Sequence, residues 1–312
     1  MRGLLDEIIE IPKWARECLR VHASLKLPVG VPYVGMGSSY NAPLVLYYSG
    51  APIEPQMASE YFYYRKSEKL PLGVLISQSG SSSETLWCTE RFERFLAVTA
   101  TPASALAHAS NCSGVIDIHT DREEFFSATK SFTNTLITLS IGLGIDMRQA
   151  VGVLASQFSA LEEAAKRQTD RVSNYLNNRH TKGLYILGSG PNYGIALQGA
   201  LTLSEVTKYA WVGMSVAQFD HGPKETADDS IIITLNARGY NAKRLASVLS
   251  LVEKKSNACI VRFSQDSLPE IQTPLPFICQ LNFFMNYLAD NIGVGSTFAL
   301  GKKVTKVDDT LR

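Results

Sequence analysis

Short apolar runs alternate with longer stretches of helical spacing along most of this chain. Six such runs begin at Tyr33, Leu72, Phe95, Leu184, Ser230 and Ala258. Continuous apolar runs are typical of strands that are buried on both faces, and the helical stretches between them are typical of crossover connections in parallel sheets. The pattern therefore predicts an α/β fold with two parallel sheets, each flanked by helices in three layers.

The two halves of the chain have similar patterns. YVGMGSSYNAPLVLYYSG from Tyr33 and LYILGSGPNYGIALQGAL from Leu184 each contain an apolar run, a G-x-G turn and a long uncharged helical stretch. Between them, residues 151–178 have the spacing of a long surface helix that links the halves. We place the domain boundary near residue 165, which gives domains 1–165 and 166–312. Pro12 should break the first helical stretch into two helices.

Composition narrows the possible classes of protein. The chain has 312 residues, 45% of them hydrophobic, with 30 Lys+Arg against 29 Asp+Glu. At roughly 100–200 residues per domain, this length allows two domains with cores of their own. The near-neutral charge gives no reason to expect nucleic acid or an anionic membrane as partner, because such partners require many uncompensated basic residues.

Cysteine usage and the chain ends indicate a compartment. The five cysteines form no C-x-x-C pair and no Cys/His cluster, so we expect free thiols in a reducing compartment and no metal site. No stretch has the length and apolar content of a signal peptide or a membrane span, which favours a cytoplasmic protein. The glycine spacings at Gly188 and Gly295 match neither a dinucleotide fingerprint nor a P-loop, so no cofactor is expected.

The loop Ser77–Thr85 carries the most candidate chemistry. Six of its nine residues bear hydroxyls, Gly80 permits a tight turn, and Ser81 with Glu84 fits a capping box ahead of a predicted helix. Hydroxyls, free backbone N–H groups and a helix dipole can together hold a phosphate monoester without Lys or Arg. The alternative is a serine-rich loop that only caps a helix. Because the loop follows a predicted buried strand, we favour phosphate binding.

A second strand-end turn contains Ser38 and Ser39, whose hydroxyls could also contact a phosphate. The alternative, which is equally good, is a simple turn that connects a strand to a helix. In the second half, Gln198, Thr202 and Glu205 fall on one helix face. A partly buried Glu205 would have a raised pKa and would suit proton transfer, whereas a solvent-facing glutamate would not.

Two further residues are candidates on weaker grounds. His221 lies in a Gly-Pro turn and could act as an acid or base near neutral pH, although most single histidines are structural. Lys302 near the C-terminus could bring an amine to a site, although lysines in a terminal tail usually contribute only solvated charge.

Six motifs occur in a recognisable order. They are GMGSSY, ASEY, SQSGSSSET, SATKSFT, GSGPNYGIALQGALTLSE and QFDHGP. From about residue 30 to the C-terminus, the chain resembles the tandem sugar-isomerase (SIS) domains of the glucosamine-6-phosphate synthase family, specifically their isomerase half. The resemblance implies an enzyme that isomerises hexose 6-phosphates, or that forms or deaminates amino-sugar 6-phosphates.

The resemblance also assigns roles to residues. It implies that the side chains of Ser77, Gln78, Ser79 and Ser82 hold the sugar phosphate with help from Ser39. We expect Ser38 and Thr129 to belong to the same substrate- and phosphate-binding site. Glu205 would move a proton between C1 and C2, Lys302 would condense with the ketose carbonyl, and His221 would open the sugar ring of the neighbouring subunit. A homodimer is therefore expected.

The chain departs from the family pattern at several positions. Gln198 and Thr202 stand where the family has Glu and Lys, and Ser81 replaces a glutamate of the phosphate loop. The chain starts at Met1 without a glutaminase part, so we expect any ammonia to come from a separate source. The alternative to an enzyme is a sugar-phosphate-binding protein that regulates a partner without catalysis.

Overall fold

The computed structural model describes residues 3–65, 68–294, 297, 299–301 and 303–306. Its internal contacts divide the chain into two compact units. We call them the β1–β5 unit, which holds residues 13–146 and the described residues from 299 to 306, and the β6–β9 unit, which holds residues 3–12 and 147–297. Each unit is described by itself.

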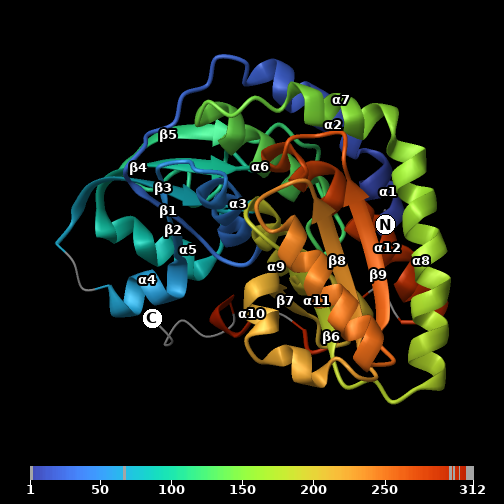
Figure 1. Ribbon diagram of the computed structural model, residues 1–312. Coiled ribbons are helices and arrows are strands. Elements are labelled where there is room, and N and C mark those ends of the chain that lie inside the picture. The colour runs from blue at the N-terminus through green and yellow to red at the C-terminus, as the bar shows by residue number, and fades with distance from the viewer. Residues whose placement is uncertain (1–2, 66–67, 295–296, 298, 302, 307–312) are drawn as a thin grey trace. The chain divides into compact units, whose positions relative to one another are not determined.

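The β1–β5 unit is built on a parallel sheet of order β2-β1-β3-β4-β5 (Figure 1). Its strands are β1 (Pro32–Gly35), β2 (Glu54–Met57), β3 (Leu70–Ile76), β4 (Phe92–Thr99) and β5 (Cys112–Asp117). Its helices are α2 (Ile11–Val21, from Lys13 on), α3 (Ser38–Tyr48), α4 (Ala58–Tyr64), α5 (Ser83–Trp87) and α6 (Lys130–Gly142), with short 3₁₀ turns η1 (Cys88–Arg91) and η4 (Val304–Lys306).

The β6–β9 unit is built on a parallel sheet of order β7-β6-β8-β9. Its strands are β6 (Leu184–Gly188), β7 (Val212–Ser215), β8 (Ile231–Ala237) and β9 (Cys259–Gln265). Its helices are α1 (Leu4–Ile9), α7 (Arg148–Ser156), α8 (Phe158–Asn178), α9 (Pro191–Thr207), α10 (Val216–Asp220), α11 (Ala242–Lys255) and α12 (Pro274–Ile292), with 3₁₀ turns η2 (Pro223–Thr226) and η3 (Glu270–Gln272).

Helices cover both faces of each sheet, so the predicted three-layer α/β fold is confirmed. In the β6–β9 unit, Leu187 of β6 and Ile232 of β8 pack against Phe219 of α10 and Leu249 of α11. On the other face α12, which is buried along most of its length, packs against α8 and α9. Such burial explains why the sequence of α12 is apolar on all sides.

The two G-x-G turns have the same local geometry. Gly37 and Gly190 both have positive φ, 54° and 55°, which favours glycine. A side chain at Gly35 or Gly188 would overlap a backbone carbonyl in the first turn of the helix that follows. Both turns therefore bring a helix start very close to the end of a buried strand.

The structure differs from the expected boundary near residue 165. The division between the units falls after Asp146, and the predicted linking helix is two helices, α7 and α8, interrupted at Gln157. Both belong to the β6–β9 unit, because α8 packs along α12. The break predicted at Pro12 is confirmed, since α1 ends at Ile9 and α2 begins at Ile11. Within the described residues, no helix is long and apolar enough to cross a bilayer.

Candidate functional site

Four serine hydroxyls form two hydrogen-bonded pairs in the loop that follows β3. Ser77 is almost fully buried, and its Oγ donates a hydrogen bond to the Oγ of Ser82 at 3.2 Å. The hydroxyls of Ser79 and Ser81 are 2.9 Å apart, and the N–H of Ser81 points to Ser79 Oγ at 3.3 Å. The loop thus presents two pairs of hydroxyls at the carboxyl end of a buried strand, which is the position that the sequence predicted.

Gly80 and Gln78 fix the shape of this loop. Gly80 has a φ of +59°, donates its N–H to the carbonyl of Ser77 at 3.0 Å, and leaves no room for a Cβ beside the side chain of Ser104. The carbonyl of Gln78 accepts from Thr99 Oγ1 at 3.1 Å and from the N–H of Ala100 at 3.0 Å. The loop is therefore fixed by its backbone, and its hydroxyls are held in place before any ligand binds.

The predicted capping box is wrong. Helix α5 begins at Ser83 with Ser82 as its N-cap, so Ser81 lies outside the helix. Glu84 does not reach back to the cap. Instead its Oε1 accepts a hydrogen bond from Thr305 Oγ1 at 3.1 Å. The helix predicted after the loop is also shorter than expected, because β4 already begins at Phe92. A helix of this length has a small dipole, which leaves the hydroxyls as the main polar groups of the loop.

Part of the C-terminal segment lies against the start of α5. Ser83 Oγ donates to the carbonyl of Thr305 at 2.9 Å, next to the contact of Thr305 with Glu84. This places η4 beside the serine loop within the β1–β5 unit. Lys302, the predicted condensing lysine, lies outside the described residues.

Ser38 and Ser39 follow β1, the strand next to the one that leads into the serine loop. They begin α3 directly after β1, and both are half-buried. β1 pairs in parallel with β3, so the loops that follow these strands emerge at the same edge of the sheet. Chain order reverses at this point, because β2 lies on one side of β1 and β3 on the other. Ligands of open α/β sheets bind at such points.

Thr129 has a structural partner. It is buried at the start of α6, and both its N–H and its Oγ1 donate to Glu123 Oε1 at 2.8 Å. Ser131 Oγ donates to the same carboxylate. Burial raises the pKa of Glu123, and these hydrogen bonds oppose the rise. A phosphate at Thr129 would have to displace Glu123, so the role predicted for Thr129 requires a rearrangement.

Glu205 lies in the last turn of α9 and is half-buried between the buried Leu203 and Val206. α9 runs back along the sheet from the carboxyl end of β6. Because an α-helix rises 1.5 Å per residue, Glu205 lies about 20 Å from the start of α9. Glu205 therefore lies toward the amino-terminal edge of the sheet, near the start of β7. Of the two alternatives that the sequence left open for this residue, partial burial is the one observed.

The two departures on the same helix are fully enclosed. Gln198 and Thr202 are at most 1% exposed, and Thr202 Oγ1 donates to the carbonyl of Gln198 at 3.1 Å. Thr202 thus makes a hydrogen bond within its own helix. This contact is structural.

His221 is the C-cap of α10, the helix that follows β7, and it is exposed. Its neighbour Asp220 was missed in the sequence. The carboxylate of Asp220 accepts hydrogen bonds from Lys224 at 2.9 Å and from Arg244 at 3.0 Å, and these cations lower its pKa. The spacing of Asp220 and Lys224, four residues apart, was the available signal. The ion pairs hold the turn in which His221 lies.

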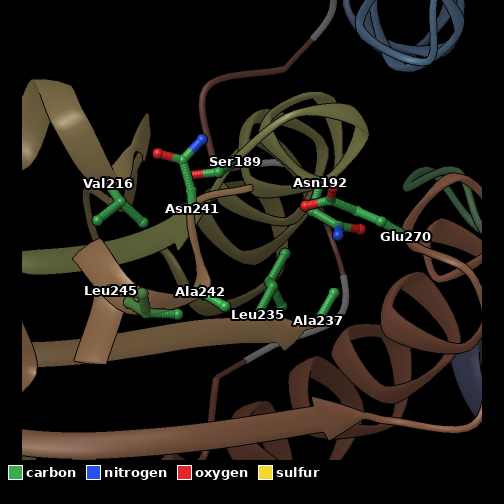
Figure 2. Close-up of a pocket in the computed structure, with 9 residues that line it drawn as sticks. All are labelled: Ser189, Asn192, Val216, Leu235, Ala237, Asn241, Ala242, Leu245 and Glu270. Carbon is green, nitrogen blue, oxygen red and sulfur yellow. The ribbon is translucent and has the colours of Figure 1, made fainter. Parts of the chain in front are cut away.

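The sequence did not indicate a pocket that the structure shows at the end of the β6–β9 sheet. It lies at the ends of β6 and β8 and is drawn in Figure 2, with the side chains of Ser189, Asn192, Val216, Leu235, Ala237, Asn241, Ala242, Leu245 and Glu270 as its lining. Burial raises the pKa of Glu270, and a hydrogen bond from the backbone N–H of Tyr240 opposes the rise. Glu270 comes from η3, far from the other residues in sequence, so no local pattern indicated it. Across the part of the chain that is described, no group of three His, Cys, Asp or Glu could hold a metal ion.

Comparison with known proteins points to sugar-phosphate enzymes. No protein-family model matches the chain. Curated relatives include the glutamine–fructose-6-phosphate aminotransferases (isomerizing) of Geobacillus kaustophilus, 25% identical over 87% of this chain and 50% of theirs, and of Aquifex aeolicus, 25% identical over 93% and 55%. The chain thus spans about half the length of the curated relatives it matches.

Solved structures share the fold at lower identity. Glucosamine-6-phosphate deaminase from Thermotoga maritima has a TM-score of 0.76 at 19% identity, covering 94% of this chain and 96% of that one. Tagatose-6-phosphate ketose/aldose isomerase from Escherichia coli has a TM-score of 0.72 at 17% identity, covering 93% of each chain. The C-terminal domain of glucosamine-fructose-6-phosphate aminotransferase from Francisella tularensis has a TM-score of 0.75 at 20% identity, covering 94% and 96%. The chain is therefore homologous to the isomerase part of the glutamine–fructose-6-phosphate aminotransferases and has the fold of phosphosugar isomerases.

Proposed function

We propose that this chain is an enzyme that acts on a hexose 6-phosphate or its 2-amino derivative. One observation carries the proposal: the fixed serine loop after β3 presents paired hydroxyls at the point of the sheet where chain order reverses. Ser77, Gln78, Ser79 and Ser82 would bind the phosphate. Hydroxyl and backbone donors suit a single phosphate group, and a near-neutral chain then needs no basic surface.

The chemistry we assign is a proton transfer between adjacent carbons. With the sugar ring opened by His221, the carboxylate of Glu205 would take a proton from one of C1 and C2 and return it to the other. Ketose and aldose are isomers, so this step needs no oxidant, reductant or cofactor. Lys302 would condense with the ketose carbonyl to form an imine, the carbonyl oxygen leaving as water, and hydrolysis of the imine would release the lysine again.

The related proteins support an enzyme that acts on a sugar phosphate, but they catalyse different reactions. The aminotransferases that match in sequence, and the deaminase and the ketose/aldose isomerase that match in fold, are each named for a 6-phosphate sugar. Isomerisation, deamination and synthesis from free ammonia share the proton transfer between C1 and C2. We therefore propose the proton transfer that these reactions share. A turnover assay with each sugar phosphate identifies the substrate.

A second candidate is a sugar-phosphate-binding protein that regulates a partner. The observation in its favour is Thr202, which is enclosed and bonded to its own helix where the related synthases carry a lysine. A chain that has lost one charged group of the catalytic helix could retain the phosphate loop for binding alone.

One assay separates the two candidates. The protein is incubated with fructose 6-phosphate plus ammonia, and separately with glucosamine 6-phosphate, and product is measured alongside binding. We expect turnover of at least one of these sugars or of a related hexose 6-phosphate. Binding, seen as a rise in melting temperature, without turnover of any of them would favour the regulator.

A further inference from the structure

The turn that carries His221 is attached to the β6–β9 unit on both sides. Before the turn, Phe219 of α10 is fully buried in the core of the unit. After it, the hydroxyls of Thr226 and Tyr185 share a hydrogen bond, which ties the end of η2 to β6. Contacts between these two anchors therefore decide how firmly His221 is held.

The carboxylate of Asp220 closes the turn. Its Oδ1 accepts a hydrogen bond from Lys224 Nζ at 2.9 Å. Asp220 is the last residue of α10 and Lys224 lies in η2, so this ion pair spans His221, Gly222 and Pro223. The two ends of the turn are thereby joined.

The second oxygen of the same carboxylate fixes the turn to another helix. Asp220 Oδ2 accepts from Arg244 at 3.0 Å, and Arg244 lies on α11, which packs against α10 (Figure 1). The side chain of Asp220 is 28% exposed, which limits competition from water. A single exposed ion pair contributes little, whereas a carboxylate that two cations hold through different oxygens has a fixed orientation.

Packing gives the turn little support. His221 is exposed, and a Cβ added to Gly222 would meet no atom within 4 Å. Neighbouring side chains therefore leave open space at this point of the chain. The two ion pairs of Asp220 supply a constraint that close packing does not.

We propose that Asp220 is a positioning residue for His221 in the opening of the sugar ring. The inference rests on the proposed function, in which His221 performs this step. Ring opening breaks the bond between the anomeric carbon and the ring oxygen, while a proton leaves the anomeric hydroxyl and one is added to the ring oxygen. The step needs no other reactant. It does need the imidazole within hydrogen-bond distance of these atoms, and a displacement of about 1 Å can lower a rate about 100-fold.

A sugar that cannot close a ring isolates this step. Fructose 6-phosphate closes through its 5-hydroxyl, because its 6-hydroxyl carries the phosphate, so 5-deoxyfructose 6-phosphate stays open. With ammonia present, Asp220→Asn should lower kcat/KM for fructose 6-phosphate at least about tenfold and leave the value for the 5-deoxy sugar within about twofold of wild type. His221→Asn should show the same selective loss. The combined variant should lose no more than His221→Asn alone, because Asp220 acts through His221.

Two further variants separate positioning from a general effect of lost charge. Asp229→Asn is the matched control, because Asp229 belongs to the same unit, is 33% exposed and is paired with Arg179 and Lys182. It should keep wild-type kinetics on both sugars. Arg244→Gln leaves the carboxylate of Asp220 in place and removes one partner, so it should reproduce part of the selective loss. Equal losses on both sugars in Asp220→Asn, or no loss on either, would overturn the proposal and leave the proposed function standing.

Hydrogen–deuterium exchange tests the positioning without turnover. The N–H groups of His221 and Gly222 donate to carbonyls of α10, so a peptide covering 217–225 reports on the turn. Exchange in this peptide should be faster in Asp220→Asn than in the wild-type protein and in Asp229→Asn. Unchanged exchange would overturn the role of Asp220. No turnover of any hexose 6-phosphate by the wild-type protein would overturn the proposed function and the ring-opening role with it, while faster exchange would still show that Asp220 holds the turn.

Discussion

Glu205 and Glu270 are half-buried carboxylates of the same unit. The sequence indicated Glu205 because of its place on a helical face with apolar neighbours. Glu270 gave no such signal, since its position against Gly190 and Gly239 depends on how β9 and η3 are placed in the folded unit. A local helical period was thus enough to propose a role for Glu205, whereas no local pattern indicated the position of Glu270.

Replacing Glu205 tests the proton transfer. Glu205→Gln keeps the shape of the side chain and removes the base, so kcat should fall about 100- to 10,000-fold with KM little changed. Steady-state kinetics on the sugar that the wild-type protein turns over measures this. Glu253→Gln, at an exposed position paired with Arg262, is the control and should keep full activity. A kcat within about twofold of wild type for Glu205→Gln would exclude Glu205 as the base.

The raised pKa of Glu270 predicts a pH-dependent stability. A carboxyl whose pKa is higher in the folded than in the unfolded state contributes stability when protonated, and this contribution is lost as pH rises through the folded pKa. Glu270→Gln should therefore raise the melting temperature relative to wild type at pH 7, by an amount that shrinks toward pH 4. Glu163→Gln should show no such trend. A melting temperature lowered at pH 7 and recovering at pH 4 would contradict the assigned cause.

At the scale of elements, the apolar runs predicted β1, β3, β4, β6, β8 and β9. The strands that were missed are β2, β5 and β7, and all three are edge strands. They are short and partly exposed, so they lack the continuous apolar run of a central strand. The loop after β3 was predicted correctly as a turn with hydroxyls, but its cap was misplaced by one residue, because capping depends on backbone angles that sequence spacing does not determine.

Gly80 tests whether the loop must be fixed in order to bind. Gly80→Ala adds a Cβ at a φ of +59° and against Ser104, so the loop should shift at a cost of about 1–3 kcal/mol. The affinity of the loop for phosphate should fall, because the shift moves the serine hydroxyls. Gly152→Ala is the control, because Gly152 lies in α7 with open space around it, and alanine there should stabilise by about 0.5–1 kcal/mol. Denaturant unfolding and phosphate titration measure both effects, and unchanged affinity in Gly80→Ala would contradict a fixed seat.

At the scale of the whole molecule, the fold class was predictable and the division of the chain was not. The alternation of strands and helices predicts two sheets, and two sheets are present. The units exchange chain ends, however: residues 3–12 join the β6–β9 unit, and the described residues from 299 to 306 join the β1–β5 unit. Contacts such as Thr305 with Ser83 link residues that are far apart in sequence, and no local pattern encodes them.

Shared sites in a homodimer are a prediction at this scale. If His221 serves the neighbouring subunit, mixing inactive Glu205→Gln and His221→Asn proteins should restore part of the activity, because some mixed dimers then contain one site with both residues. Analytical ultracentrifugation should give twice the mass of the chain. Persistent inactivity of a mixture that exchanges subunits would place both residues in one subunit.

Phosphate binding by the serine hydroxyls is the step on which the proposed function depends. It is tested most directly by steady-state kinetics on the double variant Ser77→Ala with Ser82→Ala, which removes one hydrogen-bonded pair of hydroxyls. Since a hydrogen bond to a charged group contributes about 1.5–3 kcal/mol, the Michaelis constant for the sugar phosphate should rise at least about tenfold. Ser247→Ala, on the exposed side of α11, serves as control and should leave this constant unchanged. A wild-type Michaelis constant in the double variant would contradict the account.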